Sequence, residues 1–350
     1  KNIHALMFYP TITQGETGKG NGIIASLFEF KHFFLEKLST VFPEPQGALL
    51  SGLILGGKQS LGSTWLDIFK SAGIIHIIVL SGYNMTIVST WLVSIFRFLG
   101  FYGSISVGTV GIVLFVLMTG AGATVVRAGI MAIIALLARA TGRTYTMGRA
   151  LLLAGVGMVI HNPSILLYDP SFQLSFLASL GLVFVSPILE RYITRPKKYP
   201  ALREVIVSTL ATQVMVLPLL LYQTGLLSVV ALPVNLIVLP IIPLTMLLGF
   251  IAGIFAVITP VIAQVFALPA QILLSYILHV AEYSVRLPYA TVSFPISTST
   301  LVVSYILITA VIVRAHRTTG FARLHQDVTI PSSPPPSEAI DKKEPPQIRL

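Results

Sequence analysis

Long apolar runs recur along most of this 350-residue chain and limit what it can fold into. A helix needs about 20 predominantly apolar residues to cross the hydrocarbon core of a bilayer. Apolar windows bounded by charge, proline or glycine cover residues 74–99, 104–120, 125–138, 151–160, 172–189, 205–222, 226–258, 261–287 and 301–313. These windows predict roughly eight to ten helices that cross or enter a membrane.

The composition excludes a water-soluble globular enzyme. Only 10% of the residues are charged and 54% are hydrophobic, whereas soluble domains carry about 25% charged residues. The apolar runs are continuous rather than alternating, which disfavours a β-barrel. We therefore predict an all-α fold, a polytopic transmembrane helix bundle with interfacial and proline-broken helices. The chain has no cysteine, so disulfides, thiolate metal sites and thiol nucleophiles are excluded.

The flanks differ from the apolar centre. Residues 1–22 hold a short strand-like piece and a glycine-rich run, which we interpret as the end of a truncated β-like module in a chain that begins at Lys1 rather than Met. Charged residues interrupt the apolar pattern at 23–45, which predicts an interfacial amphipathic helix. Residues 46–313 form the predicted polytopic membrane domain, and the basic, proline-rich residues 314–350 are predicted to be a disordered tail.

Basic residues in short loops predict the orientation. Arginine and lysine gather at 139–149, 191–203 and 314–323. Short loops with such an excess face the cytoplasm, so we expect all three stretches to lie inside. The net charge of +10 suits either an anionic leaflet or contact with a polyanion.

Two of the apolar windows contain helix breakers. Pro233, Pro240 and Pro243 lie with Asn235 in the window 226–258, and each proline removes a backbone donor and disturbs the preceding turn. Broken helices at membrane depth are tolerated where they are buried in protein or line a wet cavity. This segment is therefore predicted to line a path, and a second break is predicted at residues 80–82.

Polar side chains inside a bilayer are costly, so each is a candidate for a transport path or for pairing. Arg127 either snorkels to the outer interface or clamps a phosphate or carboxylate in a cavity. Asp169 either caps the following helix or shares a helix face with Gln173. A lone histidine such as His76 or His161 is more typical of interhelical hydrogen bonding or an interfacial position than of a metal ligand.

A polar stripe marks the window 261–287. Its members recur at steps of three, four or seven residues and so share one helix face: Gln264, Gln271, Ser275, His279, Glu282 and Arg286. Glu282 and Arg286 stand in the favoured i,i+4 order for an ion pair. The stripe either lines a pore or lies flat at the membrane interface.

Enzymatic templates fail on this sequence. It contains no His-Glu-x-x-His, no Gly-x-Ser-x-Gly, no paired carboxylates in one helix and no histidine–aspartate cluster with metal-ligand spacing. The glycine-rich run ending in Gly18-Lys19-Gly20 lacks the leading glycine and the Ser/Thr of a phosphate-binding loop. We therefore predict no catalytic residue, no metal and no cofactor, and a protein that is not an enzyme.

Several stretches together resemble the membrane channel domain of the ComEC competence family. They are Gln46–Gly56, Phe69–His76 leading to Leu80-Ser81-Gly82-Tyr83-Asn84, Val126–Ala132, Asn162-Pro163, Tyr168–Phe176, Gln213 with Leu217-Pro218-Leu219, and Pro233-Val234-Asn235. The family usually has Ser-Gly-Leu-His where this chain has Ser81 to Asn84, so a polar group is kept and a titratable one is lost. The resemblance covers residues 46–313, and the metal-binding signature of the nuclease-like domain found in many relatives is absent.

The resemblance implies a bacterial inner-membrane channel, with multiple passes, for the uptake of single-stranded DNA. It also implies an outer DNA receptor and a cytoplasmic ATPase or helicase as partners. The residues expected to line the path are His76, Ser81, Tyr83, Asn84, Arg127, Asp169, Phe172, Gln173, Gln213 and Asn235. Aromatic side chains among them either stack on passing bases or pack in the helix bundle.

Two other functions fit parts of the sequence. A secondary transporter or flippase for a small anionic solute would use the proline-broken segment and Arg127 as a midplane site. An intramembrane hydrolase or transferase would require His76 and Asp169 to meet in space. The oligomeric state is open.

Overall fold

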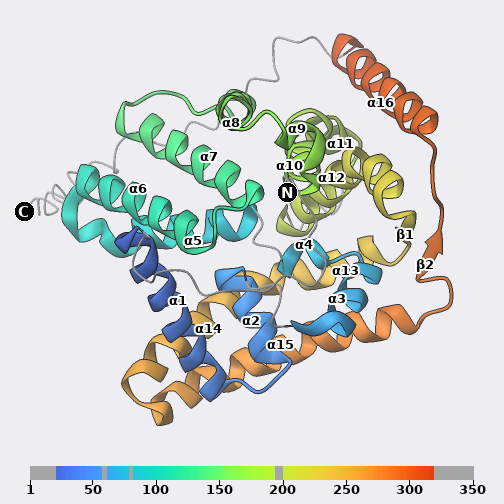
Figure 1. Ribbon diagram of the computed structural model, residues 1–350. Helices are drawn as coiled ribbons and strands as arrows, with labels where there is room; N and C mark the ends of the chain where they lie inside the picture. The colour runs from blue at the N-terminus through green and yellow to red at the C-terminus, as the bar shows by residue number, and fades with distance from the viewer. Residues whose placement is uncertain (1–20, 57–60, 79–81, 194–199, 319–350) are drawn as a thin grey trace, which may run out of the picture.

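The computed structural model describes residues 21–56, 61–78, 82–193 and 200–318 (Figure 1). The first half contains α1 (Gly22–Val41), α2 (Gln46–Leu55), α3 (Gly62–Ser71), α4 (Ile75–Ile78), α5 (Gly82–Ile95), the 3-10 helix η2 (Phe96–Leu99), α6 (Gly100–Met118), α7 (Ala123–Ala140) and α8 (Met147–His161). The second half contains α9 (Ile165–Tyr168), α10 (Pro170–Leu180), the π-helix η3 (Gly181–Val185), α11 (Ser186–Tyr192), α12 (Pro200–Thr224), α13 (Ala231–Val238), the 3-10 helix η4 (Leu239–Ile241), α14 (Ile242–Ile258), α15 (Pro260–Arg286) and α16 (Thr298–Thr318).

The predicted all-α class is confirmed. Within the described ranges, the β-structure is a single antiparallel pair of short strands, β1 (Leu226–Ser228) and β2 (Thr291–Ser293). Leu226 lies opposite Ser293 and Ser228 opposite Thr291. Strand β1 follows α12 and strand β2 precedes α16. The segment α13–α15 therefore begins and ends at the same point of the fold, the strand pair.

The structure has seven helices long and apolar enough to cross a membrane, counted over its described residues. They cover 84–118, 123–140, 170–192, 202–224, 231–258, 261–286 and 298–317, and two shorter apolar helices cover 46–55 and 147–161. The chain is therefore a multi-pass membrane protein. The long window at 226–258 begins with strand β1 and continues as a single candidate span, not as two crossings.

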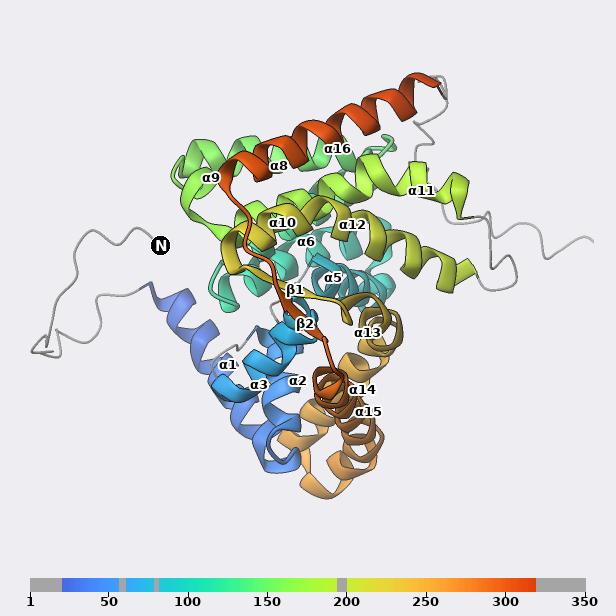
Figure 2. The same ribbon diagram turned by 90° about the vertical axis from the view of Figure 1, so that its right-hand side faces the viewer.

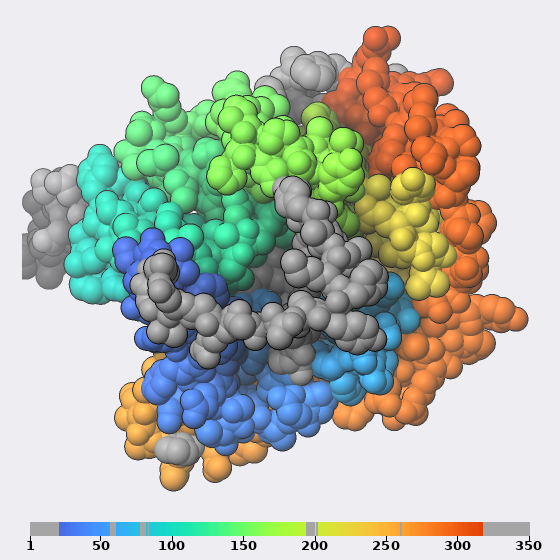
Figure 3. All heavy atoms as spheres, viewed as in Figure 1, coloured from blue at the N-terminus to red at the C-terminus, as the bar shows by residue number. Residues whose placement is uncertain are grey.

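Two groups of helices cross each other in the molecule. Figure 1 shows α10 and α12 end-on and α14 and α15 from the side, whereas Figure 2, turned by 90°, shows the reverse. Helices α1 and α2 pack on the α14–α15 pair, and the blue and orange surfaces meet along the lower edge of Figure 3. Gly249 makes this packing close, because a Cβ atom there would lie 2.3 Å from Leu50 Cδ1.

The structure has a helix break at the predicted proline position, whereas most of the other predicted position, residues 80–82, lies outside the described residues. Helix α13 ends at Val238, a 3-10 turn containing Pro240 follows, and α14 starts at Ile242. Helix α4 ends at Ile78 and α5 begins at Gly82, while residues 79–81 lie outside the described part. Proline removes the backbone donor that would continue the α-helical ladder, which accounts for the 3-10 turn.

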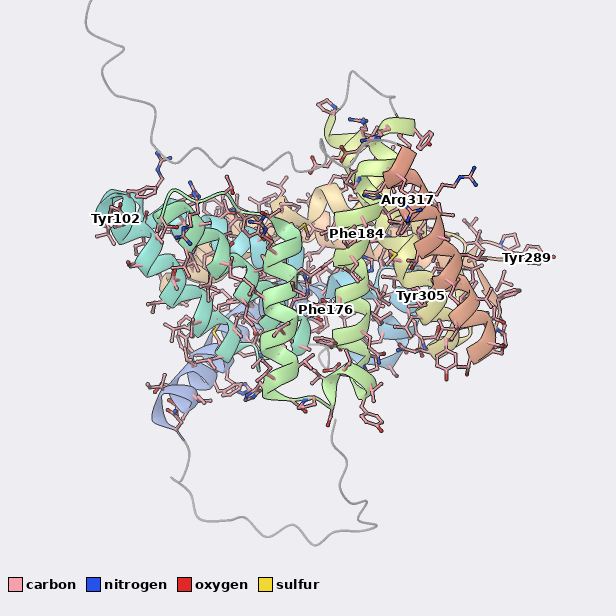
Figure 4. The ribbon with its side chains drawn as sticks, turned by 90° about the horizontal axis from the view of Figure 1, so that it is seen from above. Tyr102, Phe176, Phe184, Tyr289, Tyr305 and Arg317 are labelled. Carbon is pink, nitrogen blue, oxygen red and sulfur yellow. The ribbon has the colours of Figure 1, made fainter. Side chains whose placement is uncertain are left out.

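The described residues of the three basic stretches lie at one end of the bundle formed by α7, α8, α10–α12 and α16, where Gly148 and His316 both lie close to η3. The start of α12 is tied to the end of α11, since Arg203 Nε donates to the Ile193 carbonyl at 2.6 Å. His316, near the end of α16, lies 6.4 Å from the Phe184 ring. Figure 4 places Arg317 and Tyr102, at the start of α6, towards the same side. This arrangement agrees with the predicted orientation, and the cytoplasmic assignment stays a prediction.

The predicted boundary between the membrane domain and the C-terminal tail differs from the observed one. Helix α16 continues to Thr318, so residues 314–318 belong to a helix and not to the tail predicted from 314 onward. Arginines in a last helical turn interact favourably with the negative end of the helix, which explains the extension. The predicted β-like module at 1–20 and the rest of the tail, 319–350, lie outside the described residues. Helix α1 covers most of the predicted interfacial segment 23–45.

Candidate anion site around Arg127

Arg127 is the charged side chain that is buried in the described ranges, with 7% of its surface exposed. It lies in the second turn of α7 and reaches α10. Its Nε donates to Ser175 Oγ at 2.6 Å, and its Nη1 donates to Ser179 Oγ at 2.6 Å. A weaker contact joins Nη1 to Met131 Sδ at 3.5 Å. The guanidinium is therefore held by α10 and does not snorkel to an interface.

The partners of Arg127 carry no charge. Over the residues that the structure describes, no carboxylate lies within ion-pair distance of the guanidinium. Burying a cation without a counter-charge is expensive, and hydroxyl groups offset only part of that cost. The guanidinium therefore keeps an uncompensated positive charge among the described helices.

The third nitrogen of the guanidinium points to the start of α5. A Cβ atom built on Gly82 would lie 2.9 Å from Arg127 Nη2. In the same ranges of the chain, Nη2 has no hydrogen-bond partner. The N-terminus of an α-helix carries a partial positive charge, so two positive groups face one another here.

The charge of Arg127 is felt at the neighbouring loop. Tyr145 lies between α7 and α8, outside the candidate spans. Burial raises the pKa of the Tyr145 hydroxyl above its ordinary value, and the positive charge of Arg127 opposes that increase. The basic end of the bundle and the buried cation are thus electrostatically linked.

The start of α10 is built by two other predicted residues. The Asp169 carboxylate accepts from the backbone N–H groups of Ser171, at 2.8 Å, and Phe172, at 3.3 Å. It is therefore the N-cap of α10, the first of the two alternatives considered for it. No hydrogen bond or ion pair joins it to His76 in the part of the chain described.

Gln173 connects three segments at the same end of α10. Its Nε2 donates to the carbonyls of Leu166, at 2.9 Å, and Leu167, at 3.0 Å, which belong to α9. Its Oε1 accepts from Gln223 Nε2, near the end of α12, at 2.9 Å. Gln173 is half-buried and fully engaged, so its amide holds α9, α10 and α12 together.

The two phenylalanines of α10 pack against each other and against α8. Their ring centroids are 4.3 Å apart, and Phe172 is 4% exposed. Figure 4 shows Phe176 between α8 and α10, and a Cβ atom on Gly155 of α8 would lie 2.8 Å from its ring. In this state of the molecule the rings form helix packing rather than an open stacking surface.

Asn84 joins α5 to the ends of two short helices. Its Nδ2 donates to the Leu53 carbonyl in α2 at 3.1 Å and to the Ile77 carbonyl in α4 at 3.5 Å. The residue is 1% exposed. Carbonyls in the last turn of a helix have no intrahelical partner. Asn84 therefore supplies a hydrogen-bond donor to carbonyls at the ends of α2 and α4.

Replacing Asn84 with leucine is expected to destabilise the protein by about 1–3 kcal/mol, because hydrogen bonds to buried carbonyls are lost without a change of size. Thermal unfolding in lipid nanodiscs measures the effect. Thr90→Val is the control on the same helix, since the Thr90 hydroxyl is exposed and bonds only to the Thr86 carbonyl. Equal melting temperatures for the two variants would contradict this role for Asn84.

The remaining predicted residues are not brought to Arg127 by any contact described. Asn235, in α13, is 5% exposed and its Oδ1 has no hydrogen-bond partner. Gln213 is half-buried on α12, and His76 is exposed on α4. Ser81 and the Tyr83 side chain lie outside the described residues. The predicted path residues therefore fall into separate groups, and Arg127 is the one among those described that has a free donor edge beside a helix start.

The polar stripe of α15 is used for helix packing along part of its length. Gln271 Nε2 donates to the Val41 carbonyl at 2.9 Å, and Gln46 Nε2 donates to Ser275 Oγ at 3.0 Å. Farther along, Glu282 and Arg286 form the expected ion pair at 2.5 Å. The middle of the stripe thus binds α1 and α2.

Sequence reasoning missed Ser175 and Ser179, the two residues that hold Arg127. They stand four positions apart, on one helix face, and Ser175 lies in the motif quoted above. Single serines are common in membrane helices, so only the position of α7 beside α10 reveals their role.

The fold and this site define a polytopic α-helical membrane protein with a buried, unpaired cation between its helices. The chain belongs to the competence protein family. Residues 53–318 match the model of this family. It is similar to ComE operon protein 3 of Bacillus subtilis (strain 168), with 26% identity over 235 residues. The match covers 65% of this chain and 29% of that relative, so the chain spans less than a third of the relative's length. No solved structure matches the chain.

Proposed function

We propose that this chain forms a channel that carries single-stranded DNA across the cytoplasmic membrane of a bacterium. Family membership gives the chain a role in competence, the uptake of DNA by cells. The observation that carries the finer proposal is the buried guanidinium of Arg127, whose Nη2 is directed at Gly82 and lacks a partner in the described chain. A phosphodiester is the anion that a DNA channel must accommodate.

Physical chemistry explains why such a channel needs a buried cation. Single-stranded DNA carries one phosphate per nucleotide, and hydrocarbon excludes it unless helices supply a hydrated or cationic path. A conducting site must attract each phosphate and also release it. One guanidinium edge provides a contact of this kind, whereas a cluster of cations would hold the strand. Phosphates passing in sequence would each replace the missing counter-charge.

The other elements of the path are also proposals. We propose that the amides of Asn84, Gln173, Gln213 and Asn235, on α5, α10, α12 and α13, line other parts of the path. Asp169 and Phe172, at the start of α10, and His76, Ser81 and Tyr83, before and at the start of α5, complete the proposed lining. We propose an outer DNA receptor and a cytoplasmic ATPase or helicase as partners, because the sequence contains no nucleotide-binding motif. We further propose that the chain transports DNA without catalysing a reaction on it.

Uptake of fluorescent single-stranded DNA tests the proposal. Cells would carry the gene intact, deleted, or with Arg127→Ala, and membrane abundance of each variant would be verified by immunoblot. We expect deletion to abolish uptake and Arg127→Ala to lower it about tenfold or more, since a charge-assisted contact with each phosphate is lost. Ser304→Ala, on the outlying helix α16, is the control that leaves uptake unchanged.

Unchanged uptake in the deletion strain would overturn the DNA channel. The buried cation would then favour a transporter for a small anionic solute, and radiolabelled phosphate flux into proteoliposomes would test that function.

A further inference from the structure

We propose that Ser175 and Ser179 are positioning residues that keep Arg127 charged and direct its Nη2 edge at a phosphodiester bound beside Gly82. The proposal rests on the proposed function, because the phosphodiester is that of the transported strand. It assigns a role to two hydroxyls that sequence reasoning missed, and a new role to Gly82.

The hydroxyl of Ser179 acts towards Arg127 only as an acceptor. Its O–H donates to the Ser175 carbonyl at 3.0 Å, and a hydroxyl has one proton to donate. Its lone pairs therefore receive the Nη1 hydrogen at 2.6 Å. The backbone of α10 thus fixes both the place and the polarity of the group that holds the guanidinium.

The two serines satisfy the guanidinium without neutralising it. An aspartate at either position would bind the same nitrogens more strongly, but it would form an ion pair with no net charge. A phosphate arriving at such a pair would meet a carboxylate. Neutral acceptors leave the full positive charge for the incoming anion.

The same contacts select which edge of Arg127 remains available. Nε and Nη1 are occupied by the two serines, so the planar guanidinium cannot rotate without losing both bonds. Nη2 is left near Gly82, where an added methyl group would lie 2.9 Å away. Gly82 therefore keeps the edge uncovered, and the start of α5 adds its own positive potential.

Binding of a fluorescent thymidine oligonucleotide to the purified full chain in zwitterionic nanodiscs tests the proposal. We expect Ser179→Asp to weaken binding at least tenfold while the melting temperature is kept or raised, because the new ion pair stabilises the fold. Ser179→Thr retains the hydroxyl and should bind within about threefold of the parent protein. Ser304→Asp adds the same charge on α16 and should leave affinity unchanged.

A second variant tests whether the Nη2 edge of Arg127 must stay uncovered. Gly82→Ala is expected to weaken oligonucleotide binding without loss of the folded protein, since the methyl meets a side-chain nitrogen and no backbone atom. Unchanged affinity in Ser179→Asp would overturn the proposal. The proposal would also be overturned if anionic lipid displaced the oligonucleotide from the parent protein but not from Ser179→Asp. That result would show that the occupant of the site is a lipid headgroup.

The outcome is separable from that of the proposed function. If deletion leaves DNA uptake intact but Ser179→Asp weakens oligonucleotide binding, the positioning role stands and the channel does not. If deletion abolishes uptake while Ser179→Asp binds normally, the channel stands and the positioning role fails.

Discussion

Gly181→Ala is expected to remove most of the folded protein from the membrane. A Cβ atom at this position would lie 2.5 Å from the Ala211 carbonyl oxygen and 3.0 Å from its carbon. Both are backbone atoms of α12, so no rotamer change relieves the collision. The π-helical segment η3, which continues α10, would have to separate from α12, at a cost of about 3 kcal/mol or more.

The measurement is thermal unfolding in nanodiscs, combined with membrane abundance. Gly148→Ala is the matched control, because its Cβ would meet Val183 Cγ1 at 3.5 Å, an ordinary contact with the same π-helical segment. A methyl group should be tolerated there and should even favour the helix slightly. Similar melting temperatures for the two variants would show that the contact between η3 and α12 yields easily.

Gly73→Ala should have the second large effect, for two separate reasons. Gly73 has a φ of +75°, a left-handed conformation that residues with a Cβ rarely adopt. It closes α3 in a Schellman motif, in which Ile74 N donates to the Phe69 carbonyl at 2.9 Å and Gly73 N to the Lys70 carbonyl at 3.1 Å. A Cβ there would also lie 2.4 Å from the Cβ of Ala231, at the start of α13.

Gly142→Ala separates the two costs. Gly142 closes α7 with the same pattern, since Arg143 N donates to the Ala138 carbonyl at 2.9 Å and Gly142 N to the Arg139 carbonyl at 3.3 Å. Its φ is +64°, and nothing lies within 4 Å of a Cβ built on it. It should lose only the conformational term of about 1–2 kcal/mol, whereas Gly73→Ala should lose about 2–3 kcal/mol more. If the two variants unfold at the same temperature, the junction between α3 and α13 is not closely packed in the membrane.

Local features of the sequence predicted a large part of the fold. Apolar run length located the long helices because the bilayer imposes one length on all of them. Asp169 before Pro170 indicated a helix start, and the spacing of Glu282 and Arg286 indicated their ion pair. Each of these signals acts within a few residues, so no knowledge of the packing is needed to interpret it.

Features that depend on distant contacts could not be predicted in the same way. The strand at 226–228 was interpreted as part of an apolar span. Its pairing could not be recognised locally, because the partner strand lies far along the chain, at 291–293. The stripe on α15 was expected to be wet, yet Gln271 and Ser275 contact the N-terminal helices. The site shows the same limit: Arg127 was singled out as a costly charge, and its serine partners depend on how α7 meets α10.

The strand pair β1–β2 also sets an order of assembly. Strand β1 leaves the ribosome well before β2, and its pairing is extended by Val229 N to the Ala290 carbonyl at 2.9 Å and by Phe294 N to the Gly225 carbonyl at 2.7 Å. These bonds form only after α13, α14 and α15 have been synthesised. Helix α16 follows β2 in the chain, so it can reach its place against α12 only after α13, α14 and α15 have been synthesised.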